Sequence, residues 1–192
     1  LTHSHFGNIS KRVGNRMLIS MTGAMLDELE EAIVEVPLEG KISGNTFTSS
    51  KYGFTYTKPG GWSWMKTAAT PGFQIGATHK DLRVEVLVLS NRRKSNLEAH
   101  KTQETRRLRR TYRKFNIEDA KCGEVQGFIW SAIDSDRNRK LPPDQALSFT
   151  MEAHFVTERY IYVVRVSCFE VNKDTNEKAM RTAIEGLKLT EE

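Results

Sequence analysis

Residues 40–65 alternate short runs of strand-forming side chains with turns that contain glycine or proline. Two runs, 45–48 and 52–56, place aromatic residues at alternate positions and are separated only by Ser-Ser-Lys. A Lys-Pro-Gly-Gly turn then leads to Trp62-Ser63-Trp64. Period-two alternation bounded by turn residues is typical of half-buried strands. The segment therefore predicts two short antiparallel strands, a proline turn and an aromatic anchor at the start of a sheet.

The pattern continues through most of the chain and is interrupted by two helical segments. Further strands are predicted at 72–78, 82–89, 121–133, 146–157 and 159–170, the last two joined as a hairpin. The first helix is predicted over 95–115, with Ser95 as N-cap and Glu98 completing a capping box. The second is predicted over 174–187, with Asp174 as its cap. Hairpins with flanking helices indicate an α+β class, an antiparallel sheet covered by helices. They exclude the strand–helix alternation of a parallel dinucleotide-binding sheet.

An additional helix is predicted over residues 8–36. Apolar residues recur there at spacings of three and four, and Pro37 would end the helix. We therefore expect a helical segment at 1–38 and an α+β domain at 39–192. The segment either packs on the domain or is the tail of an upstream region.

The residues from Gly44 to Phe54, followed by Lys58-Pro59-Gly60-Gly61-Trp62, resemble the start of PsbP-like domains. In that family an aromatic residue, a short turn, an aromatic-Gly-Phe strand and a Pro-x-Gly-Trp turn open an antiparallel sheet. The segment Glu-Lys-Ala-Met-Arg-Thr-Ala-Ile-Glu-Gly-Leu-Lys-Leu at 177–189 is similar to the family's closing helix and its apolar tail. The resemblance covers roughly residues 40–189. It implies an α/β/α sandwich with the sheet between helices.

The resemblance also implies a use, which is mostly that of a non-enzymatic binding module. Known members include a photosystem accessory protein and a nuclear import factor that binds a small GTPase. Many bacterial members are exported or membrane-tethered, so the resemblance favours such a location. Because one fold serves unrelated partners, it names no partner for this chain.

Positive charge is concentrated in one segment. Between Arg92 and Lys121 there are eleven Lys and Arg residues but only four acids, a net charge of +7, whereas the whole chain carries +5. Six of these basic residues fall within nine positions of the first predicted helix. Such a surface suits an anionic or protein partner; the alternative is a solvated helix whose arginines pair with the chain's own acids. The residues that we expect to bind a partner are Arg106, Arg109, Arg110, Arg113 and Lys114.

Nucleic acid is disfavoured as the partner because no aromatic platform or nucleic-acid motif accompanies the arginines. An alternative site is a ligand groove lined by Trp62 and Trp64, which point the same way along one strand. Anchoring in the core is the more common use of tryptophan at such a corner.

No metal site or cofactor is predicted. Asp134, Asp136 and Asn138 copy the opening of a calcium loop, but Arg139 stands where that loop needs glycine. His3 and His5 could bind copper or nickel only if Leu1 were a free amino terminus.

Catalysis has little support, and no catalytic residue is predicted. Glu85 and Glu152 lie within strands, where each is expected to face solvent or to pair with Arg83 or Arg165. The two cysteines, Cys122 and Cys168, are too few for a disulfide framework. They are either buried free thiols or a single pair. No uninterrupted apolar run approaches the roughly 18 residues that a membrane helix needs.

These observations favour a non-catalytic binding or scaffold domain that engages a protein or anionic partner through the arginine-rich helix. The alternative is a small-ligand-binding protein, or an enzyme not recognised from its motifs, with its pocket beside the two tryptophans.

Overall fold

A computed structural model describes residues 10–13, 16–20, 33–37, 40–66, 68, 70–133 and 147–190, with only the backbone described in the first three ranges. The chain divides into two compact units, Leu1–Glu39 and Gly40–Glu192. Each is described on its own below.

The described part of the first unit is a three-stranded antiparallel sheet in the order β1-β2-β3. Its strands are β1 (Ser10–Val13), β2 (Arg16–Ser20) and β3 (Ile33–Pro37). The helix predicted over 8–36 is therefore wrong in these stretches. The two residues between β1 and β2 are Gly-Asn, a hairpin signal, and β3 is mostly β-branched, which outweighs the apolar spacing. Residues 21–32 lie outside the described part of the chain.

The second unit contains a seven-stranded antiparallel sheet in the order β10-β11-β12-β13-β9-β8-β7. Its strands are β7 (Ser63–Met65), β8 (Phe73–His79), β9 (Leu82–Ser90), β10 (Phe115–Cys122), β11 (Val125–Ile133), β12 (Ser148–Val156) and β13 (Tyr160–Phe169). A smaller antiparallel sheet has the order β14-β6-β5-β4. It consists of β4 (Lys41–Ser43), β5 (Thr46–Ser49), β6 (Phe54–Thr57) and β14 (Leu187–Leu189). The predicted antiparallel α+β class is confirmed.

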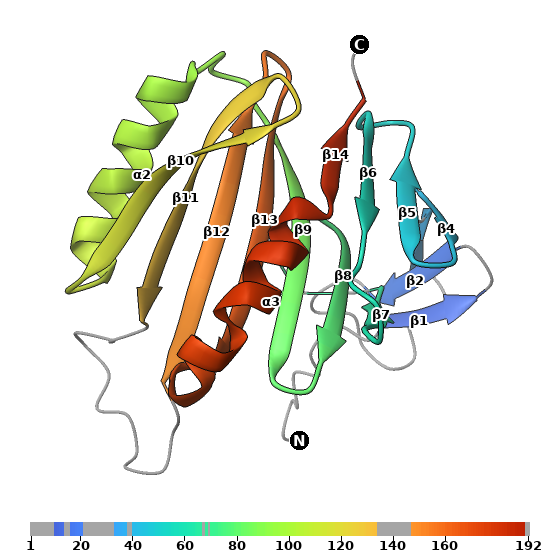
Figure 1. Cartoon of the computed structure of the whole chain (residues 1–192). Helices are drawn as coiled ribbons and strands as arrows, with labels where there is room; N and C mark the ends of the chain where they lie inside the picture. The colour runs from blue at the N-terminus through green and yellow to red at the C-terminus, as the bar shows by residue number, and fades with distance from the viewer. Residues whose placement is uncertain are drawn as a thin grey trace, which may run out of the picture. The chain divides into compact units, whose positions relative to one another are not determined.

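Two helices lie on opposite faces of the seven-stranded sheet (Figure 1). Helix α3 (Lys173–Glu185), preceded by a 3-10 turn (Glu170–Asn172), packs on β12, β13 and β9. Together with the aromatic residues of β5 and β6 it forms the main core on that face. Helix α2 (Leu97–Thr111) packs on β11 and β12 from the other side. There Leu108 meets Phe128 and Trp130 in a second core.

The first predicted helix is shorter than its apolar spacing suggested. It ends at Thr111, and its N-cap is Asn96, whose side chain accepts a hydrogen bond from the Ala99 amide, in place of Ser95. The chain then forms β10 and turns at Gly123, with φ of +59°, into β11. The prediction of a single strand at 121–133 therefore corresponds mainly to β11, the second strand of the β10–β11 hairpin, and the first strand of that hairpin was not predicted.

The second predicted helix is nearly correct in extent, but Asn172 occupies the capping position and Asp174 lies in the first turn. The calcium-like stretch at 134–139 and the histidines at positions 3 and 5 lie outside the described residues.

Candidate functional site

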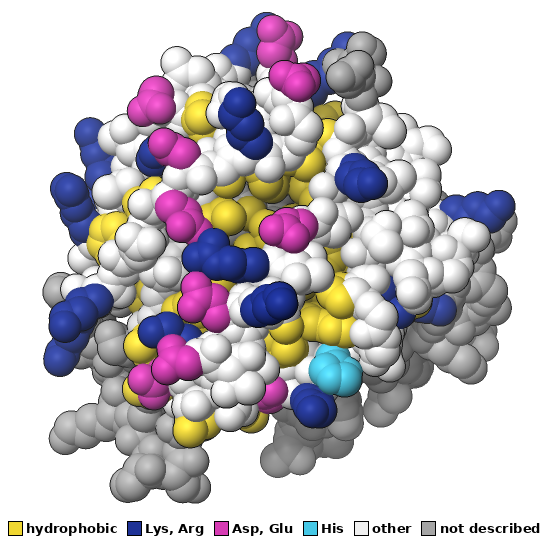
Figure 2. Space-filling model, in the orientation of Figure 1, with side chains coloured by type: hydrophobic (Ala, Val, Ile, Leu, Met, Phe, Trp, Pro, Cys, Tyr) yellow, Lys and Arg dark blue, Asp and Glu magenta, His cyan; other side chains and the backbone are white. Residues whose placement is uncertain are grey.

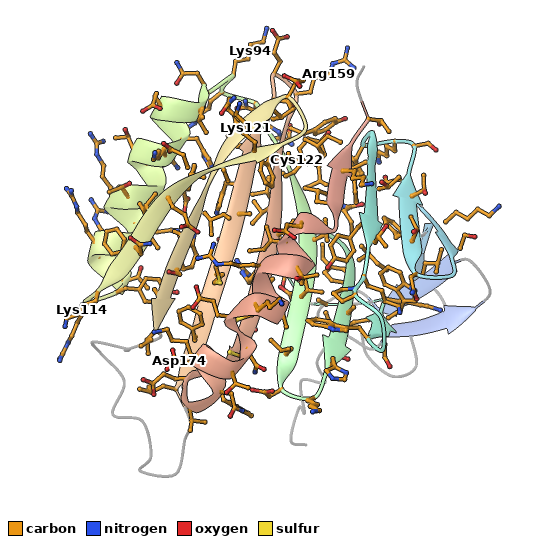
Figure 3. All side chains as sticks on the ribbon, viewed as in Figure 1. Lys94, Lys114, Lys121, Cys122, Arg159 and Asp174 are labelled. Carbon is orange, nitrogen blue, oxygen red and sulfur yellow. The ribbon has the colours of Figure 1, made fainter. Side chains whose placement is uncertain are left out.

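The outer face of α2 carries the basic residues that the sequence singled out. Arg106, Arg109 and Arg110 are exposed, and their spacing of three and four residues puts them on one face of the helix. Figure 2 shows Lys and Arg side chains gathered at the edge of the molecule that α2 occupies in Figure 1. Arg113 and Lys114 are also exposed but follow the end of the helix, and Figure 3 places Lys114 at that end. We call these five residues the arginine stripe.

The arginine stripe differs from the other basic residues of α2 in its electrostatic surroundings. Lys101 Nζ lies 2.6 Å from Asp119 Oδ1 of β10, and Arg107 Nε lies 2.7 Å from Glu104 Oε2. Within the described part of the chain, no residue of the stripe forms a salt bridge with a carboxylate. Two basic residues of the helix, Lys101 and Arg107, are therefore paired with carboxylates of this chain, whereas no residue of the stripe is paired in this way within the described residues.

Beneath α2 a row of polar side chains crosses the sheet. The strand register places Trp130, Glu152, Arg165 and Glu85 side by side on β11, β12, β13 and β9. Both carboxylates are buried, with exposures of 3% for Glu152 and 4% for Glu85. Arg165 pairs with both of them, and Arg83 pairs with Glu85. Of the two predicted alternatives for these glutamates, pairing with Arg83 or Arg165 is confirmed and exposure to solvent is wrong.

Glu152 is the acid of this row that contacts both His154 and helix α2. It receives a hydrogen bond from Arg165 Nε, lies 3.0 Å from His154 Nε2, and lies 3.8 Å from the Arg107 guanidinium of α2. Burial alone would raise the pKa of this carboxyl group. The hydrogen bonds and positive charge of His154 and Arg165 outweigh burial and lower the pKa to about 2. Glu152 is consequently ionised across the physiological range.

Two histidines that are far apart in sequence meet at the end of this network. His100 Nε2 of α2 lies 3.0 Å from His154 Nδ1 of β12, and the ring of Phe128 stacks on His154 at 4.9 Å. Trp130 Nε1 lies 3.1 Å from His154 Nε2, and the Arg107 guanidinium lies over the Trp130 ring. No sequence motif links the two histidines, which are 54 positions apart, because only the placement of α2 brings them together.

The Glu–His arrangement resembles an acid–base pair, but its position gives a substrate no access. His154 is 4% exposed and lies under α2. A general base must come within hydrogen-bond distance of the proton that it removes. The network can position α2 on the sheet and can take up protons, but it cannot contact a substrate while α2 is in place.

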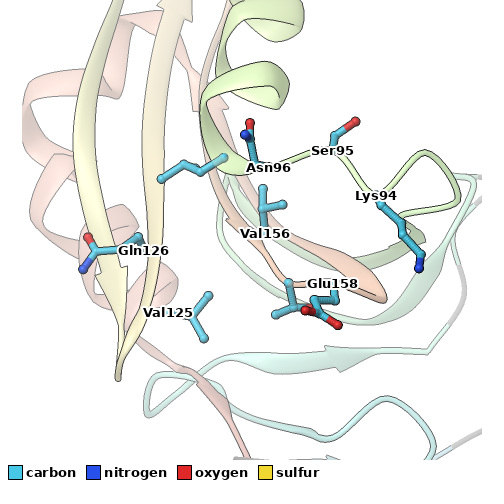
Figure 4. A pocket seen from close by; sticks show the side chains of 9 residues that line it. Lys94, Ser95, Asn96, Val125, Gln126, Val156 and Glu158 are labelled. Atoms are coloured by element: carbon cyan, nitrogen blue, oxygen red, sulfur yellow. The ribbon is translucent and has the colours of Figure 1, made fainter.

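Described residues of the second unit line at least two cavities. One, of about 630 Å³, lies at the start of α2 between two hairpin turns and has Lys94, Asn96, Val125, Val156 and Glu158 in its lining (Figure 4). It combines an apolar floor with one lysine and one glutamate at its edge.

The other cavity, of about 490 Å³, separates β10 from α3 and β14. Ile129, Phe155 and Leu187 line it, and Figure 2 shows apolar surface between charged side chains on the face that carries α3. The ion pair of Glu118 with Arg181, at 2.6 Å, lies at its edge.

Both tryptophans of the alternative site take part in packing. Trp62 is buried and stacks on His79, with ring centroids 6.1 Å apart. Trp64 is half-buried, its Nε1 donates to the Gly44 carbonyl oxygen, and its ring lies edge-on to that of Tyr56.

Both cysteines are buried free thiols, and burial raises the pKa of each. Among the described residues, no group of three or more His, Cys, Asp or Glu is arranged to hold a metal ion. No helix in the same part of the chain combines the length and apolar character of a membrane span.

Comparison with solved structures finds similarity to cyanobacterial PsbP from Synechocystis sp. PCC 6803. The TM-score is 0.50 at 12% sequence identity, over 78% of this chain and 98% of that one. A Pseudomonas aeruginosa protein of unknown function is similar at a TM-score of 0.44 and 8% identity, over 90% of this chain and 95% of that one. No protein-family model matches the sequence, and no curated protein matches it. The similarity to PsbP concerns the fold alone, and the chain has the PsbP-like fold that the sequence resemblance predicted.

Proposed function

We propose that the Gly40–Glu192 unit is a non-catalytic binding domain that docks an acidic protein surface on the arginine stripe of α2. The observation that carries the proposal is the contrast among the basic residues of this helix. Lys101 and Arg107 have carboxylate partners, whereas the stripe forms no salt bridge within the described residues. An external carboxylate surface would complete the pairing.

Arginine suits this role because its planar guanidinium forms two parallel hydrogen bonds with one carboxylate. Arg106 and Arg110 are one helical turn apart, a separation of about 6 Å along the axis. Acidic side chains one turn apart on a partner helix have the same separation. The aromatic residues next to α2, Tyr112 and Trp130, pack in the core beneath it, so no stacking platform for bases accompanies the stripe.

Non-catalytic character is supported by the closed state of the most reactive-looking cluster. Glu152 and His154 are the groups best suited to acid–base chemistry, and both are buried beneath α2. Binding through the stripe leaves that cluster covered.

The proposal can be tested with a fluorescent 20-residue poly-L-aspartate peptide and the full chain, using anisotropy at several salt concentrations. The variant Arg106→Glu, Arg109→Glu, Arg110→Glu, Arg113→Glu should bind at least about tenfold more weakly, because attraction becomes repulsion. A matched control reverses four exposed lysines outside the stripe and changes net charge by the same amount. These are Lys41, Lys80, Lys178 and Lys188.

The control variant should retain most of the affinity. Equal losses in the two variants would show that binding follows net charge, and the proposed site would be refuted. Duplex DNA and phosphatidylserine vesicles are tested in parallel. A contrary result would be that the protein binds DNA or the vesicles more tightly than poly-L-aspartate and loses that binding only in the stripe variant. That result would refute an acidic protein as the partner and identify the other polyanion instead.

A further inference from the structure

We propose that α2 is held on the sheet by a proton-operated latch, formed by His100 of α2 and His154 of β12, which opens when both imidazoles are protonated. The latch concerns how the helix is held in place and does not depend on the identity of a partner. Only its effect on binding rests on the proposed function of the arginine stripe.

The geometry requires at least one neutral imidazole. His100 Nε2 and His154 Nδ1 are 3.0 Å apart, a hydrogen-bond distance, so one nitrogen donates and the other accepts. The rings are 7% and 4% exposed, which leaves little room for water to replace the bond. An imidazolium has N–H donors at both nitrogens and no acceptor.

The structure accommodates one proton on the pair. With His154 neutral, its Nε2 accepts from Trp130 Nε1–H and its Nδ1–H donates to His100 Nε2. A proton added at His154 Nε2 can then donate to the ionised Glu152, and the Nδ1–H bond to His100 is kept. Glu152 then faces a full positive charge, which is favourable.

The structure cannot accommodate a second proton on the histidine pair. Both facing nitrogens would carry hydrogen, and two cations would lie 3.0 Å apart in a buried site. The His100–His154 contact would therefore be lost.

The charged groups around the pair do not relieve this repulsion. Arg107 of α2 and Arg165 of β13 add positive charge on either side of Glu152. Glu152 is already shared by both arginines and His154, and Glu104 of α2 is paired with Arg107. Phe128 and Trp130 of β11 complete the surroundings and carry no charge.

The pKa of His100 is lowered accordingly. Burial is the largest cause, the charge of His154 adds to it, and Arg107 acts in the same direction against the opposing effect of Glu104. The latch therefore stays closed at neutral pH and opens only as the solution becomes acidic.

Opening would release a substantial part of the helix. His100 and Leu108 are the two buried residues of α2, two turns apart, and each anchors one half. A helix of 15 residues is only marginally stable without tertiary packing. Loss of the His100 anchor would fray the amino-terminal half and loosen the platform that presents the stripe.

The latch can be tested on the full chain by measuring amide hydrogen exchange in α2 between pH 7.5 and 5, expressed as protection factors that correct for the intrinsic rate. In the wild-type protein, protection over Leu97–Glu104 should fall at least about tenfold, while β13 should remain protected. In His100→Gln, whose amide donates and accepts without titrating, α2 protection should not change with pH. His79→Gln, outside the network, serves as the control and should behave as wild type.

Constant wild-type protection of α2 over this range would overturn the latch, and this measurement needs no variant. The latch would also be overturned if the protection of α2 in His79→Gln did not change with pH. Poly-L-aspartate binding should weaken on acidification in wild type but not in His100→Gln. If the wild-type protein does not bind the peptide at any pH, the proposed function is refuted. The hydrogen-exchange measurement still tests the latch in that case.

Discussion

Replacing Glu152 with glutamine tests the electrostatic role of the buried row beneath α2. The carboxyl pKa is about 2 in the folded chain and 4.5 ordinarily, a difference of about 2.5 units. Each unit corresponds to about 1.4 kcal/mol, so ionised Glu152 contributes about 3 kcal/mol to the free energy of unfolding at pH 7. Glutamine imitates the protonated acid in shape and cannot ionise. We therefore expect Glu152→Gln to be about 3 kcal/mol less stable than wild type at pH 7.

The same reasoning fixes how this difference changes with pH. A carboxyl group whose pKa is depressed in the folded state stabilises the protein above its ordinary pKa and loses that contribution as the pH falls toward the folded value. The difference between wild type and Glu152→Gln should thus be nearly constant from pH 7 to pH 5. At pH 3 it should shrink to less than half of its value at pH 7.

Urea unfolding at pH 7, 5, 4 and 3, monitored by circular dichroism, would measure the difference at each pH. Glu185→Gln removes an exposed carboxylate of α3 and should change stability by less than about 0.5 kcal/mol at every pH. A loss in Glu152→Gln that stays the same at all four values would mean that packing, and not ionisation, is responsible. That outcome would refute the reasoning.

Three further changes test other parts of the molecule. Leu108→Ala removes the fully buried anchor of α2 and should lower the free energy of unfolding by about 2–5 kcal/mol, measured in urea. Tyr56→Phe deletes the buried hydrogen bond to the Ala183 carbonyl oxygen, which should cost about 1 kcal/mol in the same assay. Because burial raises the pKa of Cys122 and of Cys168, both should react with a thiol reagent at pH 7.5 at least about tenfold more slowly in the folded chain than in guanidinium chloride.

The β12–β13 hairpin could be predicted from sequence because its signals are local. β12 alternates apolar and polar residues, β13 is rich in β-branched and aromatic residues, and the turn between them is short. The predicted ranges 146–157 and 159–170 therefore differ little from Ser148–Val156 and Tyr160–Phe169. A hairpin register also places Glu152 opposite Arg165, and their pairing was foreseeable for that reason. Such inferences succeed where partner residues are close in sequence.

β10 was missed because its pattern fits two structures. Phe115 lies seven residues after Leu108, which suits a continuing helix, and no glycine or proline marks the change at Thr111. The alternation of β10 is also weak, because charged residues occupy its middle. Pairing with β11 decides the outcome, and a local window contains no information about that pairing.

The His100–His154 contact had no sequence signal. The two residues are 54 positions apart, and each is ordinary in its local context. Their meeting depends on which face of the sheet α2 covers and on its position along β12. Both are set by the packing of Leu108 against Phe128 and Trp130.

The arginine stripe is the part of α2 that the fold itself does not explain. Like charges three and four residues apart, as in Arg106 with Arg109 and with Arg110, destabilise a helix by a few tenths of a kcal/mol per pair. Only Arg109 and Arg110, in the last turn, recover part of this from the helix dipole. The stripe is exposed and completes no ion pair within the described residues, so neutral residues would serve the helix at least as well. The proposed acidic partner would explain why the chain keeps a row of cations that costs local stability.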